Sequence, residues 1–144
     1  MKQVLTLYGV VLGVLAVAVA MFGVAEALVL SFGAIALMAL MISGTFLWLW
    51  QVRATPLALG MSLSWAGSGL TTGWWWAMQV LQSPLCGPVA GIEAAALFLF
   101  LSLLISGAVL HFSVIQGTFG LSGLKFLWPV FGAVIVSFGV LLIL

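Results

Sequence analysis

Long apolar runs dominate the chain and are separated by short clusters of charged, proline and glycine residues. A transmembrane helix needs about 20 mainly apolar residues, and each run reaches or approaches that length. The runs lack the alternation of apolar and polar positions that marks the strands of a membrane barrel. The pattern predicts an all-α integral membrane protein with one domain and five transmembrane helices in a bundle, at about residues 3–24, 27–50, 56–81, 89–112 and 126–144. Four spans, with one weak segment re-entrant, is the alternative.

Turn signals set the predicted boundaries between these runs. Glu26 is expected at the turn of a tight hairpin between the first two helices. Thr55 suits an N-cap and Pro56 suits the first position of the third helix. The Pro/Gly cluster at residues 83–88 and the glycine-rich stretch at residues 117–123 are expected to be loops.

The first run needs to be distinguished from a signal peptide, because Lys2 precedes it and Ala25-Glu26-Ala27 resembles a cleavage site. The apolar stretch is about 22 residues long, whereas the apolar region of a signal peptide has about 7–15. We therefore interpret this run as the first membrane span.

Composition changes the picture by excluding whole classes of protein. Hydrophobic residues make up 66% of the chain and charged residues 3%, whereas a soluble domain has about 25% charged residues. A water-soluble globular fold, a disordered chain and a nucleic-acid binder are thereby excluded, since neutralising phosphates requires clustered Lys and Arg. The expected partners are membrane lipid and other integral membrane subunits or a second copy of the chain.

The few charges also predict an orientation. In a five-span topology the three basic residues, Lys2, Arg53 and Lys125, share one side of the membrane, and Glu26 and Glu93 share the other. The positive-inside rule then places the N-terminus in the cytoplasm and the C-terminus outside. The compact spans and short loops suggest a bacterial plasma (inner) membrane.

Tryptophan prefers the headgroup level of a bilayer, where its ring is apolar and its N–H finds a partner. Six of the seven tryptophans lie near predicted span ends, and Trp65 alone is deep. We expect the run Trp74-Trp75-Trp76 at the outer interface.

Small residues form stripes on two of the predicted helices. Such residues let membrane helices approach closely, and hydroxyl groups can bond across the contact. The stripes are expected to serve internal packing or a partner interface, and that of the third helix could alternatively line a path for a small solute. The positions are Gly9, Gly13, Ala16 and Ala20 in the first helix, and Gly60, Ser64, Gly67, Ser68, Thr71 and Thr72 in the third.

Glu26 and Glu93 are candidates for an ion or proton site, because a carboxylate within a membrane helix is a functional hypothesis by default. Each opens a predicted helix on the same side, where the helix dipole also favours a negative charge without any function. An ion or proton site would require one of them to lie deeper than the predicted boundary.

His111 is the single histidine and the candidate ligand of a haem or bacteriochlorophyll. Gly107 lies one turn before it and would leave room for a flat macrocycle. A small residue four positions before a histidine resembles, over two residues, the pigment-ligating pattern of bacterial light-harvesting helices. Glu93 lies about 27 Å from His111 along the same predicted helix, so the two cannot form a dyad.

The chain offers no set of residues for catalysis or for a metal site. Metal sites need several Cys, His, Asp or Glu ligands, and here these are few and scattered along the chain. We therefore expect no enzyme, no metal and no resident cofactor other than the His111 alternative. The favoured function is a non-catalytic accessory or scaffold subunit of a larger membrane complex. The alternatives are a small homo-oligomeric permease or ion channel, and a pigment- or haem-binding subunit.

Overall fold

The computed structural model describes residues 2–81, 91–116, 125 and 127–143. These residues are helical almost throughout and contain no strand, so the expected all-α fold class is confirmed for them. The helices are α1 (Lys2–Phe22), α2 (Val24–Arg53), α3 (Pro56–Leu81), α4 (Gly91–Ile115) and α5 (Trp128–Ile143). The predicted turn at residues 83–88 lies outside the described residues, as does the predicted loop at residues 117–123.

The turn between α1 and α2 lies at Gly23 and not at Glu26, which corrects the predicted hairpin. Gly23 has φ 91° and ψ 168°, a backbone conformation that is essentially restricted to glycine. Its carbonyl accepts a hydrogen bond from the Ala27 N–H at 3.1 Å. Glu26 therefore lies in the first turn of α2.

The far end of α2 is also longer than predicted, because the helix continues through Arg53 into the expected loop. Ala54 ends it in the left-handed conformation, and its N–H donates to the Trp50 carbonyl at 2.6 Å. A basic side chain in the last turn complements the negative end of the helix dipole. The next helix begins at Pro56, as the sequence predicts.

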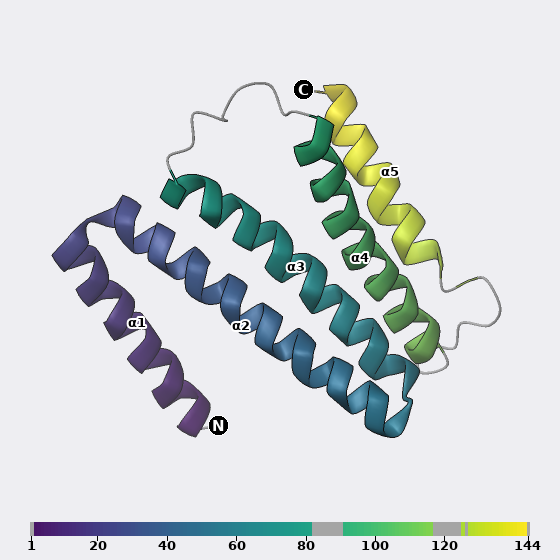
Figure 1. The fold of residues 1–144 in the computed structure, drawn as a ribbon, viewed down its shortest axis with the longest axis horizontal. Helices are drawn as coiled ribbons and strands as arrows, with labels where there is room; N and C mark the ends of the chain where they lie inside the picture. The colour runs from purple at the N-terminus through teal and green to yellow at the C-terminus, as the bar shows by residue number, and fades with distance from the viewer. Residues whose placement is uncertain (1, 82–90, 117–124, 126, 144) are drawn as a thin grey trace.

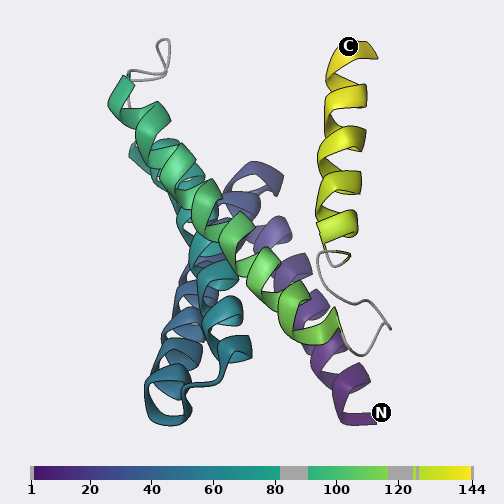
Figure 2. The ribbon, with the colours of Figure 1, turned by 90° about the vertical axis from the view of Figure 1, so that its right-hand side faces the viewer.

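Three helices, α2, α3 and α4, form the packed part of the molecule, with α3 between the other two. In Figure 2, α4 crosses the α2–α3 pair obliquely. The buried positions of this three-helix layer are all small, and no large side chain is fully buried among the residues that the structure describes. They are Ala27, Gly33, Ala36, Ala39 and Ser43 on α2, Ala58, Gly60, Ser62, Gly67 and Gly69 on α3, and Gly107 on α4.

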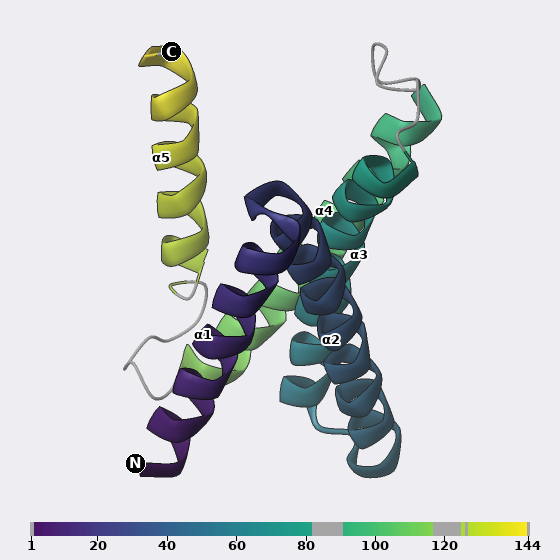
Figure 3. The ribbon, with the colours of Figure 1, turned by 90° about the vertical axis from the view of Figure 1, so that its left-hand side faces the viewer.

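The outer helices α1 and α5 are packed far less. α1 contacts α2 near their shared turn and then diverges from it (Figure 1). No residue of α1 is buried. Although α5 overlaps α4 in Figure 1, it stands apart from the other helices in Figures 2 and 3. The chain thus consists of a three-helix layer and two weakly attached helices.

Three helices are long and apolar enough to cross a membrane: Lys2–Phe22, Val24–Arg53 and Ala94–Ile115. Helix α3 has 26 residues, enough to cross, but its glycines, hydroxyls and tryptophans make it less apolar than these three. Helix α5 is apolar but has 16 residues, which span about 24 Å at 1.5 Å per residue. Length and composition together thus support three of the five spans that the sequence predicts.

Candidate functional site: helix contacts and two apolar clefts

The contact between α3 and α4 depends on glycines on both helices. A Cβ atom on Gly67 would lie 2.6 Å from the Leu104 backbone nitrogen, and one on Gly60 would lie 3.1 Å from that of His111. A Cβ on Gly107 would collide with the backbone nitrogen and the hydroxyl of Ser64. Because the obstructing atoms include backbone, these glycines set the distance between the two helices.

The contact between α3 and α2 uses the opposite face of α3. Gly69 is two residues from Gly67, which is about 200° of helix rotation. A Cβ on Gly69 would lie 3.0 Å from Leu40 and 3.2 Å from the Ala36 carbonyl oxygen. Nearer the other end, the Trp76 indole lies over Gly33 so closely that a Cβ there would be 2.6 Å from its Nε1.

A reciprocal serine pair also joins α2 and α3. The Ser43 hydroxyl donates to the Ser62 carbonyl at 2.9 Å, and the Ser62 hydroxyl donates to the Ser43 carbonyl at 3.0 Å. Both side chains are buried. The pair therefore satisfies two buried hydroxyls while fixing the register of the two helices.

The sequence interpretation missed this second face of α3. Ala58, Ser62, Gly69 and Gly73 recur at spacings of four, seven and four residues, which places them on one side of a helix. The same search for small residues at helical spacing that found the Gly60 stripe could have found this one.

Two hydroxyl groups of the predicted α3 stripe have a neighbour that accounts for them. Ser64 packs against Gly107, and the Thr71 hydroxyl donates to the Gly67 carbonyl at 2.8 Å within its own helix. Ser68 and Thr72 are half-buried. Hydroxyls that bond to their own backbone or pack between helices are poorly placed to line a polar pathway.

The small-residue stripe of α1 has no contact of this kind. No atom lies within 4 Å of a Cβ built on Gly9 or Gly13, and Ala16 and Ala20 are exposed. The half-buried residue on α1 is Ala18. It lies nine residues after Gly9, which is about two and a half helical turns, so it projects from the opposite side of the helix. The stripe faces away from α2.

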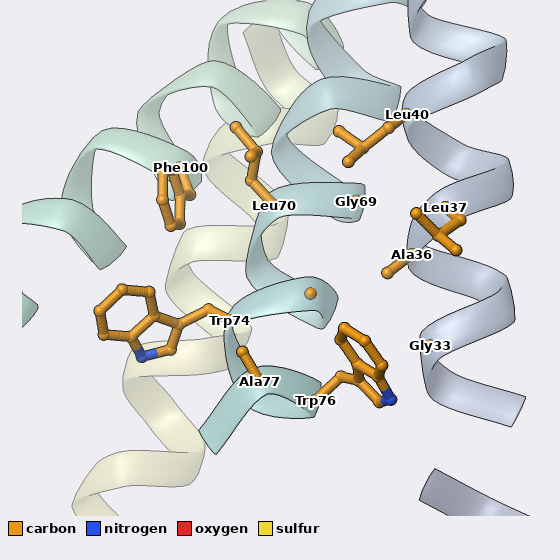
Figure 4. A pocket seen from close by; sticks show the side chains of 11 residues that line it. Gly33, Ala36, Leu37, Leu40, Gly69, Leu70, Trp74, Trp76, Ala77 and Phe100 are labelled. Atoms are coloured by element: carbon orange, nitrogen blue, oxygen red, sulfur yellow. The ribbon is translucent and has the colours of Figure 1, made fainter. Parts of the chain in front are cut away.

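A first cleft, of about 300 Å³, lies where α2, α3 and α4 meet. Figure 4 shows the Trp76 ring between α3 and α2, and the Trp74 ring on the side of Phe100. The rings of Trp74 and Phe100 are 6.3 Å apart, and those of Trp75 and Phe32 are 4.6 Å apart. These tryptophans therefore pack between helices, a role that the expectation of an interfacial belt did not include.

A second cleft, which we call the hairpin cleft, has a volume of about 590 Å³ and lies beside the α2–α3 turn. The α4 residues His111 and Val114 contribute to its wall. The remaining lining residues, from α2, the turn and α3, are Phe46, Leu49, Thr55, Pro56, Leu57, Ala58 and Met61. His111 and Thr55 are the polar residues of an otherwise apolar wall.

His111 thus faces a cleft, but not in the way the sequence suggested. The space beside Gly107 that was expected to accept a macrocycle is filled by Ser64 of α3. His111 is half-buried, and no hydrogen bond to its imidazole occurs among the described residues.

The two glutamates lie at helix starts, Glu26 in the first turn of α2 and Glu93 in the first turn of α4. Glu26 is exposed, and a Cβ on Gly23 would lie 3.2 Å from its Oε2. Among the described residues, no three His, Cys, Asp or Glu side chains are grouped so that they could hold a metal ion.

Comparison of the chain with protein-family models, with curated proteins and with solved structures found no match. A proposal of function therefore depends on the geometry of the helices and clefts.

Proposed function

We propose that the chain is a multi-pass membrane protein, with five spans and a cytoplasmic N-terminus, that acts as a non-catalytic accessory or scaffold subunit of a larger membrane complex. A bacterial plasma membrane is the proposed location. The partner is another integral membrane subunit or a second copy of this chain, which docks on the small-residue face of α1.

The observation that carries this proposal is the direction of the α1 stripe. Large aliphatic side chains suit a surface that faces lipid, whereas small residues let a second helix approach closely. On α3 the stripes lie against neighbouring helices, but on α1 the glycine face points away from the rest of the chain. An unfilled glycine face on a membrane helix is suited to a helix from another molecule.

The sparse packing of α5 adds to this argument. Its glycines, Gly132 and Gly139, also have no neighbour within 4 Å. Such glycines leave room for a helix of another molecule to approach.

The test is purification in a mild detergent followed by mass spectrometry of the co-purifying proteins. The double variant Gly9→Leu/Gly13→Leu should lose the partner, because the added side chains keep a second helix at a distance. The matched control Val11→Leu alters the other side of α1 and should retain the partner. A wild-type chain that purifies as a monomer without any membrane partner would contradict the proposal.

The permease and pigment alternatives have less support. Of the hydroxyls that were expected to line a pathway, that of Ser64 packs against Gly107 and that of Thr71 bonds to its own helix, and the space expected for a macrocycle is occupied by Ser64. Flux in proteoliposomes that is abolished by Glu26→Gln or Glu93→Gln would favour a permease over a scaffold. A visible absorption band that disappears in His111→Ala would favour pigment or haem attachment.

A further inference from the structure

The hairpin cleft combines an apolar wall with polar groups at one end of the molecule. Its volume, about 590 Å³, falls within the range of about 300–1,000 Å³ that is typical of ligand sites. Such sites are mainly apolar and carry a few polar groups that orient the ligand. Here those groups are the Thr55 hydroxyl and the His111 imidazole, which can both donate and accept hydrogen bonds.

A positive charge lies next to this cleft. Arg53 is exposed in the last turn of α2, two residues before Thr55. Two residues of extended chain span at most about 7 Å, so the flexible Arg53 side chain starts close to Thr55 in the wall of the cleft. A guanidinium presents a planar fork of donors that matches the geometry of a phosphate group.

The described carboxylate side chain, that of Glu26, is remote from this charge. Glu26 lies 27 residues before Arg53 on the same helix, about 40 Å along its axis. Glu93 starts α4, whereas His111, which lines the cleft, lies about 27 Å further along that helix. The cleft is therefore mainly apolar, with a basic residue close to its Thr55 wall, and the described carboxylate, Glu26, lies at the far end of α2.

We propose that the hairpin cleft binds an anionic phospholipid, with an acyl chain in the apolar part and the phosphate group at Arg53. His111 and Thr55 form hydrogen bonds with the polar region of the lipid. Basic pockets between transmembrane helices on the cytoplasmic side of a membrane bind anionic headgroups in this way. The site is separate from the α1 face, so it does not depend on the accessory role proposed above, but it rests on the proposed orientation, which puts the α2–α3 turn on the cytoplasmic side.

Native mass spectrometry of the detergent-solubilised chain tests the site, with phosphatidylglycerol and phosphatidylcholine of identical acyl chains added in parallel. The wild-type chain should retain phosphatidylglycerol about five-fold more strongly. That ratio corresponds to about 1 kcal/mol for one basic residue near an anionic headgroup, at 1.4 kcal/mol per tenfold. Equal retention of the two lipids would overturn the proposal.

Two pairs of variants separate the headgroup contact from the acyl-chain contact. Arg53→Gln should bring the ratio of the two lipids close to one, whereas Lys2→Gln, with the same change in charge, should leave it unchanged. Val114→Trp fills the cleft and should lower the retention of both lipids, whereas Val140→Trp on α5 should not. If Val114→Trp does not fold, Met61→Phe replaces it.

The opposite results are equally informative. An equal loss of preference in Arg53→Gln and Lys2→Gln would mean that diffuse charge attracts the lipid, and would overturn the site. Unchanged retention of both lipids by a folded cleft-filling variant, Val114→Trp or Met61→Phe, would also overturn the site. A bound molecule other than a phospholipid, released by Val114→Trp, would overturn the assignment of the ligand.

Discussion

Helices α1 and α3 carry similar stripes of small residues, yet they differ in what those stripes contact. On α3, Gly67 and Gly69 project to opposite faces and let α4 and α2 approach closely. On α1, Gly9 and Gly13 face open space. A small-residue stripe therefore indicates that a membrane helix can be approached closely, but it does not identify the helix that approaches.

The comparison also explains why α3 is less apolar than its neighbours. A helix that packs on two sides exposes less of its circumference to lipid, so it needs fewer large aliphatic side chains. Glycine and serine fill those faces because tight packing and interhelical hydrogen bonds, in place of a hydrophobic driving force, hold helices together in a bilayer. By contrast, nearly every residue of α1 is exposed.

The largest expected effect separates the two stripes directly. Gly67→Leu should lower the free energy of unfolding by about 3 kcal/mol or more, because backbone atoms of α4 block the new side chain. Gly9→Leu should change it by less than about 0.5 kcal/mol, because nothing lies near that position. Unfolding in increasing dodecyl sulfate, followed by tryptophan fluorescence, measures both. Similar losses in the two variants would show that α1 packs within the chain.

A smaller and more local effect is expected at the α1–α2 turn. Gly23→Ala should cost about 1–3 kcal/mol, because alanine rarely adopts the backbone conformation found there. Since α1 packs weakly, the cost should appear as faster hydrogen exchange around residues 19–27 while the three-helix layer unfolds as before. Gly44→Ala is the control, because Gly44 lies within α2 without a positive φ and a Cβ there meets nothing within 4 Å. A fall in the stability of the whole layer would indicate that α1 supports it.

The Ser43–Ser62 pair should contribute less to the free energy of unfolding than the Gly23 backbone conformation does. Ser43→Ala and Ser62→Ala should each cost about 0.6 kcal/mol and at most about 1.7 kcal/mol, the mean and the maximum for hydrogen bonds between membrane helices. The double variant should cost less than the sum, because each hydroxyl serves the same contact. Ser102→Ala removes an exposed hydroxyl that bonds to the Leu99 carbonyl of its own helix and should have little effect. Additive losses would argue against coupling between α2 and α3 at this point.

The smallest effect is expected on α5. The double variant Gly132→Ala/Gly139→Ala should change the stability of the isolated chain by less than about 0.5 kcal/mol, because neither position has a neighbour. The same unfolding titration measures it. A loss of stability comparable with that of Ser43→Ala would indicate that α5 packs against the three-helix layer. The difference in packing between α5 and α3 would then be smaller than described.

Part of the candidate site could be predicted from sequence and part could not. Gly60, Ser64 and Gly67 are recognisable as a helix-packing stripe because small residues at helical spacing have few other uses in a membrane. Ser43 and Ser62 were missed, although the same periodicity would have drawn attention to Ser62 and its neighbours. The pairing itself could not be deduced, because the partner of a hydroxyl depends on the relative register of two helices.

By itself, the sequence determined that the chain is helical and apolar, and placed both ends of α3 correctly. These properties follow from local physics: backbone groups in lipid must be satisfied within a helix, and proline and glycine fix where helices start and stop. Only the tertiary structure decided that α3 lies in the centre, that the α1 stripe faces outward and that His111 lines a cleft beside Arg53. Those outcomes depend on how rigid helices fit against one another, and that fit is a property of pairs of surfaces and not of single segments.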